Sequence, residues 1–91
     1  MLTLNNFHIM ASAIRAGRCA LNWSQRELAE KSGVSLPTVA RLEGANTSPK
    51  LETVIRLIGA IENAGVKFDW TTSEGFSLTF KPRNPQNVGT P

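Results

Sequence analysis

Residues 23–43, WSQRELAEKSGVSLPTVARLE, contain two short helix-like segments separated by a single glycine. In the first segment, Ser24 is followed three residues later by Glu27. This spacing is typical of a capping box, in which each side chain accepts a hydrogen bond from the backbone N–H of the other residue. We therefore predict a helix over about residues 24–32, with Ser24 as its N-cap.

The second segment begins in a similar way. Ser35 is a favoured N-cap residue, and Pro37 then falls in the first turn, where its missing N–H would have had no partner within the helix. Gly33 lies between the segments, and because it has no Cβ it can adopt the left-handed conformation that ends many helices. The pattern predicts a second helix over about residues 35–43, joined to the first by a tight turn.

Apolar residues at steps of three and four predict one helix on each side of this pair. The earlier helix covers about residues 6–21. The later helix follows the loop GANTSPK, with Ser48 as N-cap and Pro49 as its first residue, and it ends at Gly65. The residues expected to be buried are Met10, Ile14, Gly17 and Leu21 in the earlier helix, and Leu51, Val54, Ile55, Ile58 and Ile61 in the later one.

Beyond residue 65, apolar and polar residues alternate in two runs that flank the turn-like sequence TTSEG, so we predict a β-hairpin over residues 66–80. Its apolar face would consist of Val66, Phe68, Trp70, Phe76, Leu78 and Phe80. A lone two-stranded hairpin is marginal in water, so this face must be covered. We favour cover by a second copy of the chain in a homodimer, with packing on the chain's own helices as the alternative. Residues 81–91 contain three prolines and are expected to form a flexible tail.

The composition is that of one small globular domain. The chain has 91 residues, of which 41% are hydrophobic and 19% charged. Cys19 is the single cysteine, which excludes an internal disulfide framework and fits a reducing cytoplasm. Residues 1–10 lack the features of a signal peptide, and no apolar run is long enough to span a membrane. We expect a cytoplasmic protein with no membrane association.

The net charge of +3 is concentrated in the first part of the chain. Through residue 50 there are six basic and three acidic residues, whereas the remaining residues contain four of each. A polyanionic partner would therefore bind to the first part. A scattered and solvated set of charges is the alternative interpretation.

The strings SQRELAEKSGVSLPTVARLE and SPKLETVIRLIGAIENAGV resemble the lambda-repressor-like helix-turn-helix family of Cro and Xre type regulators. The resemblance covers about residues 8–65. It implies a mainly α, compact bundle of four to five short helices, here followed by the C-terminal β-hairpin. It also implies binding to double-stranded operator DNA, commonly as a homodimer on a palindrome. The expected division of the chain is a DNA-binding domain at 1–65, the hairpin at 66–80 and the tail at 81–91.

The resemblance also implies which residues contact DNA. The positions that would face the bases are Ser35, Leu36, Pro37, Thr38 and Arg41. Arg41 is suited to a bidentate contact with guanine, whereas Leu36 and Pro37 can offer only apolar contact, for instance to a thymine methyl. Direct readout should then depend on few residues, and DNA shape should contribute to specificity. The expected phosphate contacts are Gln25, Arg26, Asn46, Thr47 and Lys50, together with Arg15 and Arg18, for which plain surface is the alternative.

No enzyme is predicted, because the chain lacks a glycine-rich phosphate loop, a nucleophile with a histidine partner and an evident carboxylate pair. His8 has no companion ligands at metal-binding spacing, so neither a metal nor another cofactor is expected. Two functions remain open. The first is a transcriptional regulator, in particular a small repressor of prophage type. The second is the antitoxin of a toxin–antitoxin pair, which would bind a toxin protein and regulate its own operon.

Overall fold

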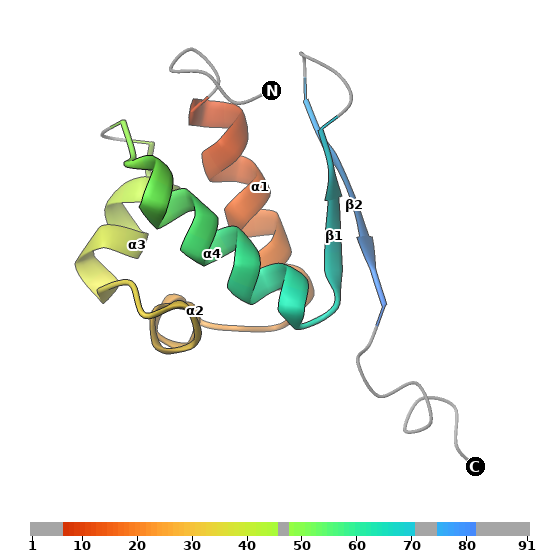
Figure 1. The fold of residues 1–91 in the computed structure, drawn as a ribbon, viewed down its shortest axis with the longest axis horizontal. Coiled ribbons are helices and arrows are strands. Elements are labelled where there is room, and N and C mark those ends of the chain that lie inside the picture. Colours follow the sequence, from red (N-terminus) through yellow and green to blue (C-terminus); the bar gives the residue numbers. More distant parts are fainter. Residues whose placement is uncertain (1–6, 46–47, 71–74, 82–91) are drawn as a thin grey trace.

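Four helices are followed by a two-stranded antiparallel hairpin in the computed structural model, which describes residues 7–45, 48–70 and 75–81. The elements are α1 (Phe7–Ala20), α2 (Gln25–Ser32), α3 (Leu36–Glu43), α4 (Leu51–Asn63), β1 (Val66–Asp69) and β2 (Ser77–Phe80). The helices form one bundle, α3 lies at one end of it, and the hairpin flanks the other end (Figure 1). This arrangement confirms the predicted mainly helical fold with a hairpin. Within the described ranges, no helix has the length and apolar character needed to cross a membrane.

The start and end of α2 follow from its capping residues. The Ser24 side chain accepts a hydrogen bond from the Glu27 N–H at 3.0 Å, and the Glu27 carboxylate accepts one from the Ser24 N–H at 2.7 Å. Gly33 has φ 77°, and its N–H donates to the Ala29 carbonyl. The predicted capping box and left-handed glycine are both confirmed. The turn that they define brings α3 directly after α2.

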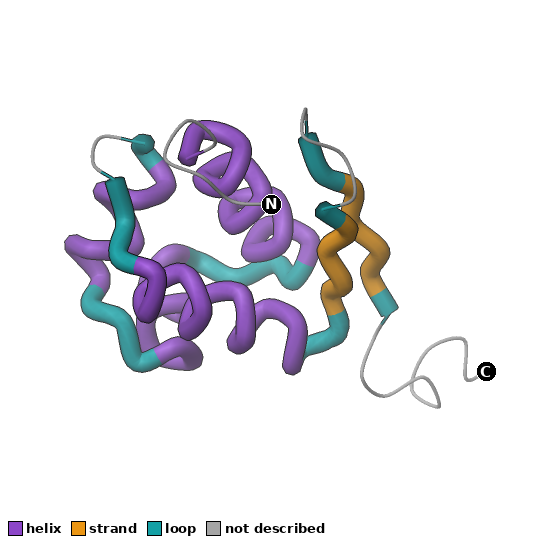
Figure 2. Tube along the Cα trace, turned by 45° about the horizontal axis from the view of Figure 1, so that its top comes forward, coloured by secondary structure: helices purple, strands orange, loops and turns teal. Residues whose placement is uncertain are grey.

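One hydrophobic core joins the helices and the first strand. Its buried members are Met10, Ala13, Ile14, Leu28, Ala29, Val39, Leu42, Val54, Leu57, Ile61, Val66 and Phe68. They come from α1, α2, α3, α4 and β1, so the hairpin shares a core with the helices that precede it. Figure 2 shows the strands lying beside the helices at the end of the molecule away from α3.

The helix α4 differs from the prediction at its start and in its rotation. It begins at Leu51 instead of Pro49, and Lys50 occupies the N-cap position without a side-chain capping bond. Its buried residues are Val54, Leu57 and Ile61. Leu51 and Ile55, which were expected in the core, are 70% and 60% exposed. Val54, Leu57 and Ile61 follow one another at steps of three and four, so they share the side of α4 that packs against the rest of the molecule.

The hairpin packs on helices of its own chain. Val66 pairs with Phe80 and Phe68 with Leu78, so the apolar side chains of the two strands share one face. Val66 is fully buried and Phe68 is 9% exposed, whereas Phe80 at the end of β2 remains 44% exposed. The need for cover, which favoured a hairpin-mediated dimer, is thus largely met within one chain. The TTSE part of the predicted turn lies outside the described residues.

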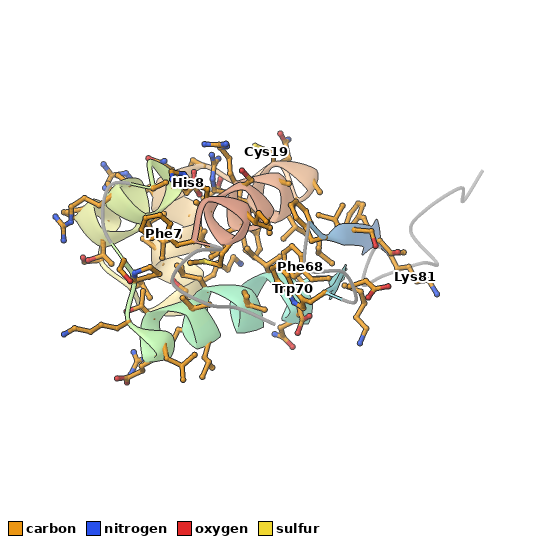
Figure 3. All side chains as sticks on the ribbon, turned by 90° about the horizontal axis from the view of Figure 1, so that it is seen from above. Phe7, His8, Cys19, Phe68, Trp70 and Lys81 are labelled. Atoms are coloured by element: carbon orange, nitrogen blue, oxygen red, sulfur yellow. The ribbon has the colours of Figure 1, made fainter. Side chains whose placement is uncertain are left out.

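Gly17 allows this close packing. A Cβ at this position of α1 would lie 2.8 Å from both Ile61 Cγ2 and Phe68 Cζ. Phe68 also stacks on Trp70, with 5.5 Å between the ring centroids, and Figure 3 shows the two rings next to each other beside the strands. Contacts of Phe76 with both rings complete an aromatic cluster. A glycine in α1 therefore makes room for the aromatic side chain that joins the hairpin to the helices.

Candidate nucleic-acid interface

The helix α3 has one buried side and one exposed side. Val39, Leu42 and Glu43 are buried, whereas Pro37, Ala40 and Arg41 are exposed. The helix lies at the end of the molecule away from the hairpin (Figures 1 and 2). A helix presented in this way can enter the major groove of DNA, which is wide enough to admit it. We refer to Pro37, Ala40 and Arg41 as the reading face.

Two polar residues at the start of α3 are hydrogen-bonded to each other. The Ser35 hydroxyl donates to Thr38 Oγ1 at 2.8 Å and accepts a longer bond from the Thr38 N–H at 3.4 Å. Ser35 is exposed and Thr38 is half-buried. Each hydroxyl keeps further hydrogen-bonding capacity, so both can still reach a base or a phosphate.

The structure places one predicted base-contact residue partly in the core and adds one that the sequence interpretation missed. Leu36 is half-buried and packs against the hydrophobic core, so little of it is available to DNA. Ala40 is exposed between Pro37 and Arg41 on the reading face. Its spacing of three from Pro37 is the signal that could have identified it, because residues three apart share a helix face.

Glu43, at the end of α3, is only 3% exposed and accepts hydrogen bonds from two other helices. Arg18 of α1 donates from Nε to Oε2 at 2.7 Å and from Nη2 to Oε1 at 3.0 Å. Gln25 of α2 donates from Nε2 to Oε1 at 3.0 Å. In addition, Arg15 Nη1 donates to the Glu43 backbone carbonyl at 3.1 Å. A single carboxylate thus fixes the end of α3 to both preceding helices.

These contacts change how the predicted phosphate contacts are understood. The Arg18 side chain is 14% exposed and also donates to the Trp23 carbonyl at 2.8 Å. The hydrogen bond with Glu43 raises the pKa of Arg18 above its ordinary value, although partial burial acts in the opposite direction. Arg18 is therefore a structural ion-pair partner, and its predicted phosphate contact would compete with these bonds. Arg15 is exposed and Gln25 half-buried, so both retain accessible surface beside their bonds to Glu43.

A groove of about 270 Å³ runs between the end of α3 and the start of α4. It is lined by Thr38, Arg41, Leu42, Ser48, Pro49, Lys50 and Thr53. Arg41 and Lys50 are both exposed, which makes this rim of the reading face cationic. At the start of α3, Arg26 and Glu30 of α2 line a shallow groove together with Ser35 and Leu36. The predicted contacts Asn46 and Thr47 lie outside the described residues.

The residues with catalytic or metal-binding chemistry are scattered. Among the residues that the structure describes, no three His, Cys, Asp or Glu side chains are grouped so that they could hold a metal ion. His8 makes an edge contact with the Phe7 ring, with 4.8 Å between the centroids. Cys19 is exposed on the outer side of α1 (Figure 3). By contrast, Arg41 of the reading face and Lys50 line one groove together.

Comparison with known proteins agrees with this geometry. The model of a helix-turn-helix family of the Cro/C1 type matches residues 14–63, which include α2, the turn and α3. A protein of Haemophilus influenzae described as an uncharacterized HTH-type transcriptional regulator is 41% identical over 44 residues, which are 48% of this chain and 45% of that protein. The chain therefore spans less than half of that relative's length. With more than half of its residues matched and the reading face exposed, the chain belongs to the Cro/C1-type helix-turn-helix family of DNA-binding transcription regulators.

Proposed function

We propose that the protein is a sequence-specific regulator that inserts α3 into the major groove of its operator. The observation that carries this proposal is the contrast between Arg41 and Glu43 at the end of α3. Glu43 is buried and bonded to α1 and α2, whereas the Arg41 side chain is exposed and has no hydrogen-bond partner within the described part of the chain. Arg41 is thus free to donate two hydrogen bonds to guanine O6 and N7.

The cations around the reading face supply the contacts that position the helix. Arg26 is exposed near the start of α3 and Lys50 near its end, where both can bind DNA phosphates. Gln25 and Arg15 can add contacts at the end of α3 near Glu43. Such contacts hold the protein on DNA of any sequence, while Arg41, Pro37, Ala40 and the two hydroxyls choose among sequences.

We further propose that the protein binds a palindromic operator as a homodimer and represses transcription by covering a promoter. Two recognition helices read successive major grooves on one side of DNA when they are held about 34–36 Å apart. A small domain of this kind gains both affinity and specificity by occupying two half-sites together. Repression by occlusion requires no part of the protein beyond the DNA-binding surface.

An antitoxin role is the second candidate. Phe80, 44% exposed at the end of β2, favours a protein contact on the hairpin, which could be a toxin or a second copy. If the protein is an antitoxin, a small protein encoded beside it will co-purify with it and be inhibited by it. If the neighbouring products neither bind the protein nor impair growth, this role is excluded.

The test of the proposed function compares two variants that each remove one positive charge. Arg41→Ala should lower operator affinity by about 1–3 kcal/mol per half-site and flatten the preference at one base pair. Lys67→Ala changes an exposed residue of β1, away from α3, and should leave the preference intact. The measurement is the ranking of operator variants by binding affinity. An unchanged ranking with Arg41→Ala would show that another residue reads the base.

A further inference from the structure

The outer side of α4 carries an apolar stripe that none of the described residues covers. Leu51 and Ile55 are 70% and 60% exposed, and Gly59 lies one turn further along the same side of the helix. Residues at these steps of four lie on one face of a helix. Leu51, Ile55 and Gly59 form what we call the α4 stripe. The two large aliphatic side chains lie on adjacent turns, so they form one continuous exposed apolar surface.

Among the described residues, neither a close contact nor a left-handed backbone requires a glycine at position 59. A Cβ placed there meets nothing within 4 Å, in contrast to Gly17, where two side chains lie at 2.8 Å. Gly59 also does not belong to the residues that adopt a positive φ. A glycine inside a helix costs about 1 kcal/mol relative to alanine. This cost is explained if another surface approaches α4 closely at Gly59.

We propose that the α4 stripe is the contact between two copies of this chain, with Ile55 nearest to the twofold axis. The two α4 helices would then run antiparallel, so residues that precede Ile55 in one copy meet residues that follow Ile55 in the other. Leu51 of one copy would then lie over the open surface at Gly59 of the other. The large side chain and the missing side chain on the same stripe are complementary in this arrangement.

Charge complementarity supports a second copy as the occupant. Glu52 and Arg56 run beside the stripe and form an exposed ion pair at 3.0 Å. A twofold axis reverses the order of these charges, so Glu52 of one copy can face Arg56 of the other. A partner surface with only positive charges would be repelled by Arg56, and one with only negative charges would be repelled by Glu52. An interface that carries both signs in this order matches itself.

The position of the stripe links this contact to the proposed DNA-binding function, on which the inference rests. Leu51 directly follows Lys50, which lines the groove beside Arg41. The stripe therefore begins next to the reading face, and two copies in contact there would both be held close to the same DNA. The stripe contains only two large side chains, whereas a stable interface buries roughly 800 Å² per partner. The contact should be weak in solution and complete on adjacent half-sites.

The first experiment measures cooperative binding to a selected two-site operator and to a duplex with one half-site scrambled. In the wild-type protein, the second half-site should fill about 5- to 150-fold more tightly than the first. Leu51→Gln and Ile55→Gln leave the charge unchanged and should bring this factor close to one, with unchanged affinity for the single half-site. Phe80→Gln, on the hairpin, is the matched control and should keep the cooperativity. Full cooperativity in both α4 variants, or its loss only with Phe80→Gln, would overturn the proposal.

Gly59→Gln separates the proposed contact from a folding defect. Among the described residues a Cβ at this position meets nothing within 4 Å, and glutamine is a better helix former than glycine, so thermal stability should rise. The new side chain should nevertheless block the close approach of the second copy and lower the cooperativity factor. Higher stability together with undiminished cooperativity would contradict the role of Gly59.

Oxidative cross-linking tests the contact without DNA, so that its failure can be distinguished from failure of the proposed function. In a Cys19→Ser background, which removes the exposed native thiol, Ile55→Cys should form disulfide-linked dimers faster than Phe80→Cys. If Ile55→Cys cross-links faster but no selected DNA is bound, the contact stands and the proposed function is wrong. If DNA is bound and Ile55→Cys cross-links no faster than Phe80→Cys, the inference is wrong and the proposed function stands.

Discussion

At the scale of single residues, Arg41 and Glu43 show how two charged side chains near the end of one helix acquire different functions. The side of α3 that carries Glu43 faces α1 and α2, and its carboxylate is surrounded by the Arg18 and Gln25 donors. Arg41 lies on the exposed side, where its guanidinium remains solvated. One residue determines the position of the helix, and the other is available to DNA.

We predict that Glu43→Gln destabilises the protein by about 3 kcal/mol, because it leaves the Arg18 guanidinium with little solvent and without its counter-charge. Urea unfolding monitored through the tryptophans measures this loss. Glu52→Gln is the control, since the Glu52–Arg56 pair is exposed and contributes less than about 0.5 kcal/mol. Equal effects of the two substitutions would show that burial does not distinguish the two ion pairs.

At the scale of elements, the contact between α1, α4 and the hairpin depends on the absence of a side chain at Gly17. We predict that Gly17→Ala destabilises the protein by about 1–3 kcal/mol, because Ile61 and Phe68 would both have to move. Gly59→Ala is the matched control, with open space at its Cβ, and should stabilise the protein by up to about 1 kcal/mol. Thermal unfolding of the two variants should give shifts of opposite sign. Shifts of the same sign would contradict the packing at Gly17.

The elements that the sequence predicted well are those with local signals. Ser24, Glu27 and Gly33 define α2 through bonds to residues no more than four positions away, so their pattern is readable without knowledge of the fold. The rotation of α4 is not local. The apolar residues of α4 make two overlapping stripes, one through Leu51 and Ile55 and one through Leu57, and only the positions of the other helices decide which of them is buried.

The support of α3 was also beyond prediction from the residues alone. Arg18 and Glu43 are 25 positions apart, and Arg15 bonds the Glu43 carbonyl over 28 positions. An arginine on a predicted helix gives no indication of whether it faces water, DNA or a carboxylate of another helix. Ala40 could have been assigned to the reading face from its spacing, whereas the partial burial of Leu36 required the structure.

At the scale of the whole molecule, the excess of basic residues lies in the first fifty residues, which include α1, α2 and α3. The hairpin lies at the end of the bundle away from α3 (Figure 1). We predict that operator affinity falls by orders of magnitude between about 50 and 200 mM salt, because phosphate contacts release counterions. Arg26→Ala should lower the slope of log affinity against log salt by about one per half-site. A slope near zero in the wild-type protein would exclude the proposed phosphate contacts.

The bonds that orient α3 are made by the buried Glu43, whereas Pro37, Ala40 and Arg41 are exposed and make no side-chain hydrogen bond among the described residues. The three outward residues can therefore be exchanged without altering the framework that orients them. A library randomised at these positions should consist mostly of folded proteins that differ in the operators they select. In evolutionary terms, new binding specificities are accessible to this chain through single substitutions that leave its stability almost unchanged.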